Sequence, residues 1–133
     1  MEEVLEIWKK ADKLAGKVDI DRIVEDENGL VCFLTDIENN KKIHIKYDSL
    51  VCAYKNVDEG FWIKTLESLL GRYGEKVLTK HSFFEVKDSS FLREIEDGVH
   101  GAIQGRDLFQ LKIIGASAIL DIISFGEPCV ETI

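Results

Sequence analysis

Apolar and charged residues alternate along the first 15 positions with the spacing of an amphipathic helix. The apolar positions are Val4, Leu5, Ile7, Trp8, Ala11, Leu14 and Ala15. Side chains three or four positions apart share one face of a helix, and charged residues fill the opposite face here. Gly16 follows, as glycine often does where a helix ends. The pattern predicts an N-terminal amphipathic helix.

Residues 18–57 alternate instead with the shorter period of β-strands. The segments with this pattern are 18–26, 30–37, 41–47 and 49–57. Asn28-Gly29 separates the first two, and this dipeptide favours a type I′ hairpin turn because both residues tolerate a positive φ. The pattern predicts a four-stranded antiparallel meander with one solvent-facing side.

Helices and strands are then expected in turn to the end of the chain. The expected elements are a helix from Asp58 to Tyr73, a strand over 82–86, a helix over 91–99, strands over 108–114 and 116–124, and a last segment over 129–133 on or near the sheet. Residues 75–81 fit either a helical extension or a loop. The segment 116–124 is almost continuously apolar, which predicts a central strand covered on both faces.

Together these elements predict a single α+β domain over residues 1–133. Its expected architecture is an antiparallel sheet of about six strands, with the N-terminal helix and two inserted helices packed on one face. A chain of this size buries roughly 65–70% of its unfolded surface, so that it needs neither disulfides nor a metal to fold.

The charge balance narrows the classes of partner. The chain carries 25 acidic and 17 basic residues, for a net charge of −8. Such a surface repels a phosphate backbone, so we expect no nucleic-acid binding, and it favours either a basic protein partner or simple solubility. No apolar run is long enough for a membrane helix, and the first residues lack the basic start of a secretion signal. We therefore expect a cytoplasmic protein without membrane contact.

No motif for catalysis, a cofactor or a metal is present. The three histidines lack the spacing of metal-binding motifs, and the three cysteines stand apart among apolar residues, as buried thiols do. The glycines at 98, 101 and 105 precede a strand, so they offer no helix N-terminus to a phosphate. We therefore expect no catalytic residue, no metal and no cofactor.

Short motifs within about residues 40–130 resemble a known family. They are VDEG before an aromatic-leading helix, FFEVKDSSFLREI, and a strand pair that ends in Glu127-Pro128. In this order they resemble a poorly characterised family of small cytoplasmic bacterial proteins, to which no activity is attached. Where that family is expected to carry Trp, this chain has Arg93-Glu94-Ile95. Small acidic proteins of this kind resemble immunity proteins that neutralise a toxin, an analogy of size and charge.

These observations favour a non-catalytic protein-binding or regulatory domain, of an immunity type, with a basic partner. The residues expected at its partner surface are Asp58, Glu59, Trp62, Glu94, Glu96, Asp97 and His100. One alternative is a small-molecule-binding protein or enzyme with a pocket near residues 81–105, where His81, His100 and Glu85 would take acid–base roles. Another is a homo-oligomeric structural subunit that pairs through a sheet edge or the N-terminal helix.

Overall fold

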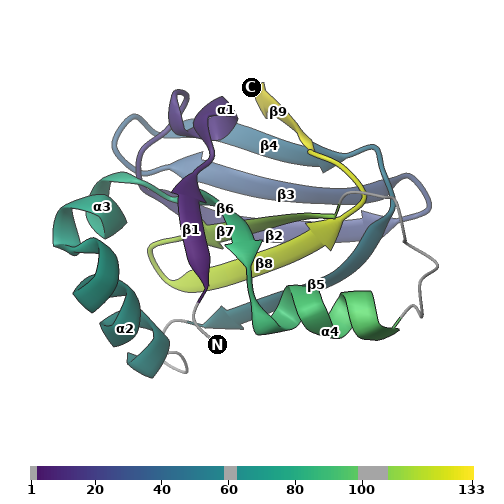
Figure 1. Cartoon of the computed structure of the whole chain (residues 1–133). Coiled ribbons are helices and arrows are strands. Elements are labelled where there is room, and N and C mark those ends of the chain that lie inside the picture. The colour runs from purple at the N-terminus through teal and green to yellow at the C-terminus, as the bar shows by residue number, and fades with distance from the viewer. Residues whose placement is uncertain (1–2, 59–62, 99–107) are drawn as a thin grey trace.

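The computed structural model describes residues 3–58, 63–98 and 108–133 (Figure 1). In these ranges the strands are β1 (Val4–Ile7), β2 (Val18–Asp26), β3 (Gly29–Asp36), β4 (Lys41–Tyr47), β5 (Val51–Asp58), β6 (Phe83–Asp88), β7 (Phe109–Ile114), β8 (Ala118–Ser124) and β9 (Cys129–Thr132). The helices are α1 (Lys9–Asp12), α2 (Ile63–Tyr73), α3 (Glu75–Lys80) and α4 (Ser90–Gly98).

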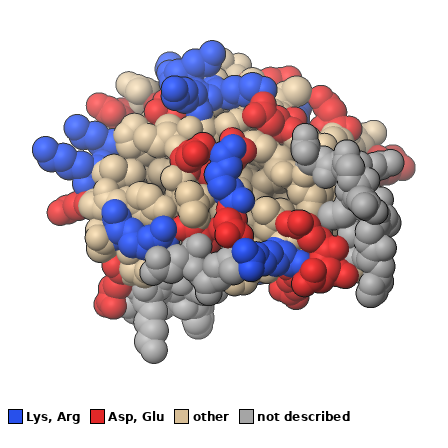
Figure 2. All heavy atoms as spheres, in the orientation of Figure 1, with Lys and Arg blue, Asp and Glu red and all other residues tan. Residues whose placement is uncertain are grey.

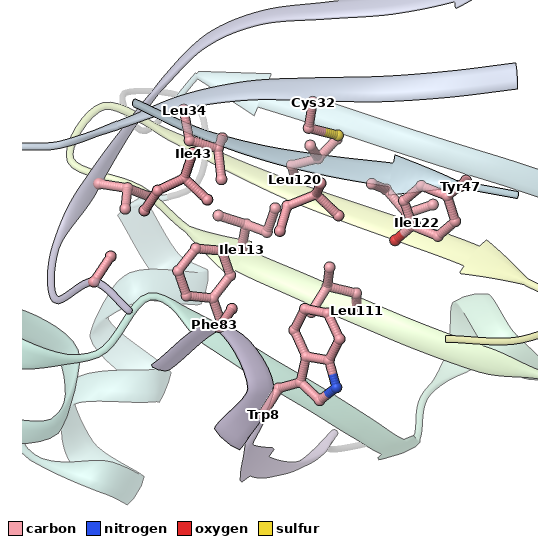
Figure 3. Close-up of a cluster of buried hydrophobic side chains, with 14 of the residues drawn as sticks. Trp8, Cys32, Leu34, Ile43, Tyr47, Phe83, Leu111, Ile113, Leu120 and Ile122 are labelled. Atoms are coloured by element: carbon pink, nitrogen blue, oxygen red, sulfur yellow. The ribbon is translucent and has the colours of Figure 1, made fainter. Parts of the chain in front are cut away.

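The strands form two antiparallel sheets. One has the order β1-β6-β7-β8-β5 and the other the order β2-β3-β4-β9. Buried side chains from both sheets make up one hydrophobic cluster, which fills the space between them (Figure 3). The prediction of an N-terminal helix with a sheet of about six strands is therefore wrong. Alternation shows which residues share a face of a strand, but it does not show which strand lies beside it.

The N-terminal segment forms strand β1 and one short helix instead of the predicted long helix. Residues Val4–Ile7 pair with β6, so Leu5 lies opposite Val86. The first and last residues of β1 are 46% and 37% exposed, although the helical pattern had placed both on the buried face. Both residues are β-branched and suit an extended chain. Pairing with the edge of β6 satisfies the backbone of this segment, and it overrides the local helical pattern.

The hairpins of β2, β3 and β4 confirm the first three strands that the alternation predicts in this part of the chain. Ile43 and Ile45 are fully buried against the other sheet, and His44 between them lies on the outer side. The first turn differs from the predicted type I′ form. Gly29 has a φ of 111° but Asn28 has no positive φ, and the backbone N–H of Asn28 donates to Asp26 Oδ1 over 2.8 Å.

The chain leaves this sheet after β4. Residues 48–50 carry it to β5, which pairs with β8 at the edge of the five-stranded sheet. The place beside β4 is taken by β9 from the C-terminal end (Figure 1). The predicted four-stranded meander is therefore right for three strands and wrong for the fourth.

The centre of the five-stranded sheet follows the sequence pattern more closely. Phe109, Leu111 and Ile113 of β7 point together into the cluster between the sheets, as expected. β8 lies between β7 and β5, and Leu120 and Ile122 join the same cluster. The prediction that this apolar segment forms a central strand is confirmed.

Three helices lie on the outer face of the five-stranded sheet, opposite the other sheet (Figure 1). Leu69 of α2 and Leu78 of α3 pack with Phe84 of β6 in a second hydrophobic cluster on this face. Phe91 of α4 lies over the ammonium group of Lys55, with 4.1 Å between the nitrogen and the ring centre. The residues predicted as helix or loop before β6 form α3.

The cysteines differ in their surroundings. Cys32 is fully buried between the sheets, whereas Cys52 is half-buried and Cys129 is exposed, so the prediction of buried thiols holds for one of the three. Burial raises the pKa of the Cys32 thiol to about 12, from an ordinary value of 9.0. Tyr47 in the same cluster also has a raised pKa, first because of burial.

Alkaline pH is expected to destabilise the fold through Cys32. Above pH 9.0 the unfolded chain loses the thiol proton, while the folded chain keeps it up to about pH 12. The free energy of unfolding therefore falls as the pH rises, by about 1.4 kcal/mol per pH unit in that window. Urea unfolding between about pH 9.5 and 11 measures this slope. In Cys32→Ala the part of the slope due to the thiol should disappear, and an unchanged slope would contradict the assignment.

Candidate functional site

A solvent-open cleft lies where the α1–β2 connection, the β3–β4 turn and the end of α3 meet. Its volume is about 320 Å³. Figure 1 shows these three connections on the same side of the molecule, at the upper left. The polar and charged residues that line the cleft are Asp12, Lys13, Asn39, Lys41, Lys80 and His81.

Asp12 and His81 form a hydrogen-bonded pair in the wall of the cleft. Asp12 Oδ1 and His81 Nδ1 lie 2.6 Å apart, and the two side chains are 22% and 29% exposed. A carboxylate oxygen only accepts, so Nδ1 carries the proton in this contact. The lone pair of the neutral imidazole ring is then on Nε2, which has no hydrogen-bond partner in the described part of the chain.

Hydrogen bonds at the start of β6 hold the two segments that carry the pair. α1 begins after Trp8, whose backbone N–H donates to the carbonyl oxygen of Phe83 over 2.9 Å. The residue that follows His81 is the buried Ser82, and its hydroxyl accepts the backbone N–H of Val18 over 3.1 Å. The segments that carry the carboxylate and the imidazole are therefore both held beside the start of β6.

Three exposed lysines line the same cleft. Among the described residues, the ammonium groups of Lys13, Lys41 and Lys80 have no carboxylate or hydrogen-bond partner. Some lysines outside the cleft are paired: Lys46 lies 2.9 Å from Glu131, and Lys112 lies 2.9 Å from Asp121. The cleft lysines are therefore available to a ligand.

The cleft is a positive region on an acidic protein. Its lining holds three lysines and one carboxylate, whereas the whole chain has a net charge of −8. Figure 2 shows basic side chains at the top, near α1, and at the left, near α3, with some acidic side chains between them, and acidic side chains gathered at the lower right, over α4. Local charge decides which ions concentrate at a surface, so this cleft attracts anions.

The acidic residues predicted at a partner surface do not meet at this cleft. Asp58 ends β5, and Glu94, Glu96 and Asp97 are exposed on α4. In Figure 1 the end of β5 and the last turn of α4 lie apart in the view, and the partner surface stays a prediction. The remaining predicted residues, Glu59, Trp62 and His100, lie outside the described residues.

Of the alternative acid–base group of His81, Glu85 and His100, the structure places His81 beside a carboxylate. His81 does lie against a carboxylate, but that carboxylate belongs to Asp12. Glu85 is on β6 and pairs with Lys87 over 2.8 Å, and His100 is outside the described residues. Sequence reasoning found the histidine and missed the aspartate and the three lysines.

A second polar group, the outer-face network, crosses the outer face of the five-stranded sheet. Ser89 Oγ donates to Gln110 Oε1 over 2.6 Å, and Gln110 Nε2 donates to Asp121 Oδ1 over 3.0 Å. Lys112 Nζ donates to Asp121 Oδ2 over 2.9 Å and lies 3.2 Å from Glu3 Oε1. Burial lowers the pKa of Lys112, but the two carboxylates raise it by more, and the pKa lies above its ordinary value. These partners satisfy one another, as buried polar groups require.

Comparisons with known proteins do not assign this site. No protein-family model, curated protein or solved structure matches the chain. The part of the chain that the structure describes holds no helix that is long and apolar enough to cross a membrane, and no group of three or more His, Cys, Asp or Glu side chains that could hold a metal ion. The geometry of the cleft therefore carries the functional argument.

Proposed function

We propose that this protein binds a small anionic ligand in the cleft beside His81, with a phosphate group as the simplest ligand that fits. The observation that carries the proposal is the meeting of three unpaired lysines and a hydrogen-bonded histidine around one open cleft of about 320 Å³. A phosphate offers several acceptor oxygens and a charge of one to two units, which matches several separate ammonium donors.

The lysines come from three different elements, and this supports recognition of a compact anion. Lys13 follows α1, Lys41 begins β4, and Lys80 ends α3. Like charges that gather without partners repel one another, and an anion between them removes that repulsion. The three free thiols agree with a reducing compartment, so a cytoplasmic location is part of the same proposal.

Removal of the cleft lysines is expected to weaken phosphate binding. An ammonium group at contact distance from an anion contributes about 1 kcal/mol in water, so each single change Lys13→Gln, Lys41→Gln or Lys80→Gln should weaken binding roughly fivefold. The triple variant should lose measurable affinity. Titration calorimetry with inorganic phosphate at low ionic strength measures this, and added salt should weaken binding to the native protein.

The matched control is the single variant Lys46→Gln. Lys46 lies outside the cleft lining and stands five positions along β4 from Lys41, roughly 16 Å away at about 3.3 Å per strand residue. This control removes one charge, as each single cleft variant does, and should leave the affinity for phosphate within about twofold, because two unit charges that far apart in water interact by only about 0.3 kcal/mol. An equal loss of phosphate affinity in the control and in the cleft variants would show that the effect comes from net charge alone, and it would contradict the proposal. So would the absence of phosphate binding to the native protein.

A further inference from the structure

The cleft brings together the parts of a phosphoryl-acceptor site. The ring of His81 lines the cleft, and its Nδ1 is held by Asp12 over 2.6 Å. Hydroxyl and thiol nucleophiles are missing from the described residues that line the cleft. With Nδ1 held by Asp12, Nε2 is the nitrogen of this cleft-lining ring that keeps a lone pair for nucleophilic attack.

We infer that His81 is a phosphorylation site, whose Nε2 accepts the phosphoryl group of an acyl phosphate bound in the cleft. This inference rests on the proposed function, because the donor must first bind through its phosphate. It goes further than the proposed function because it names the atom that forms a covalent bond and the chemical class of the phosphoryl donor.

The phosphoryl transfer is a direct displacement at phosphorus. The Nε2 lone pair forms the N–P bond, the bond between phosphorus and the carboxylate oxygen breaks, and the carboxylate leaves with that electron pair. The ring gains positive charge as the bond forms, and the carboxylate of Asp12 stabilises it through the Nδ1 proton. The cleft lysines reduce the negative charge that otherwise repels a nucleophile from a phosphate.

Asp12 is a positioning residue in this scheme. Its carboxylate can only accept, so it keeps the proton on Nδ1 and the lone pair on Nε2. An asparagine at the same position can donate its N–H to Nδ1, which moves the ring proton to Nε2 and leaves no nucleophile facing the cleft. Asp12→Asn should therefore still bind phosphate but react slowly with the phosphoryl donor. A purely structural role of Asp12 does not predict that combination.

His44 provides an internal control. It lies on the outer side of β4, in edge contact with Phe33 at 4.5 Å between ring centres. In the described part of the chain it has no carboxylate partner, and it does not line the cleft. General reactivity of imidazole with a phosphoryl donor would therefore label His44 as readily as His81.

The experiment treats the full-length protein with acetyl phosphate and follows the intact mass, with inorganic phosphate binding measured in parallel. The native protein and His44→Gln should each gain one phosphoryl group that is stable in base and lost in acid. His81→Gln should gain none. Asp12→Asn should bind phosphate within about threefold of the native protein but react roughly a hundredfold more slowly, the scale of a lost proton-positioning group.

Four results would overturn the inference. Native protein that binds phosphate but gains no phosphoryl group would leave the proposed function standing and remove the acceptor role. Equal labelling of His81→Gln would place the reaction elsewhere. Equal rates for Asp12→Asn and the native protein would remove the role of the Asp12–His81 pair, whereas loss of phosphate binding itself would overturn both proposals.

Discussion

Replacement of Asp121 with alanine is expected to lower the free energy of unfolding by about 3–5 kcal/mol, the loss that follows when one partner of a buried ion pair is removed. Asp121 holds Lys112 Nζ at 2.9 Å and Gln110 Nε2 at 3.0 Å. The lysine side chain is only 4% exposed, so water cannot replace the lost carboxylate. Glu3 would remain as its only charged partner in the described structure. Urea unfolding followed by circular dichroism measures the change.

The matched control for Asp121 is Glu3→Gln. Glu3 lies at the more open end of the outer-face network, with 23% of its side chain exposed and 3.2 Å between its oxygen and the lysine nitrogen. A partly exposed pair contributes about 1 kcal/mol or less, and Gln keeps an acceptor in place. A loss below about 1 kcal/mol for Asp121→Ala would show that the network does not hold the outer face together.

Replacement of Phe83 with alanine is expected to cost about 3–5 kcal/mol, because a fully buried ring leaves a cavity that the surrounding strands cannot close. Phe83 is 0% exposed, begins β6, and packs in the cluster between the two sheets (Figure 3). The result tests the arrangement of the sheets, since a single sheet with one wet face would leave this position less enclosed. Thermal and urea unfolding both measure it.

The control for Phe83 is Tyr54→Ala on the edge strand β5. Tyr54 is 39% exposed and is outside both hydrophobic clusters. Its replacement should change the free energy of unfolding by no more than about 1 kcal/mol. Similar losses at the two positions would contradict the placement of Phe83 in the principal core.

The parts of the fold that the sequence predicts are those where local pattern and tertiary environment agree. Ile43 and Ile45 alternate with charged residues because one face of β4 is buried and the other meets solvent. Val4 and Ile7 show where that agreement ends. Their helical spacing is real, but the open edge of β6 offers β1 a full set of backbone partners.

The division into two sheets is a long-range property that no local pattern carries. β5 alternates much like the strands before it, yet its residues pair with residues of β8 that lie 60 or more positions away. The chain crosses from one sheet to the other in the short segment 48–50, and nothing in the composition of this segment distinguishes it from an ordinary turn. β9 then fills the vacant place beside β4.

The candidate site was harder to predict for the same reason. Asp12 and His81 are 69 positions apart, and the three lysines are spread from position 13 to position 80. No spacing rule connects residues that meet only through the packing of α1, α3 and the β3–β4 turn. The signal available in the sequence was His81 itself, since a histidine beside a strand end is a common acid–base group. Its partner became visible only in three dimensions.

The central claim is that the His81 cleft binds an anion, and proton–carbon NMR of the histidine rings tests it most directly. With inorganic phosphate added stepwise at constant pH and ionic strength, the ring signals of His81 should shift and saturate, while those of His44 should stay in place. The triple lysine variant should show no such shift. Equal small shifts of both histidines, or an unchanged His81 at saturating phosphate, would contradict the account.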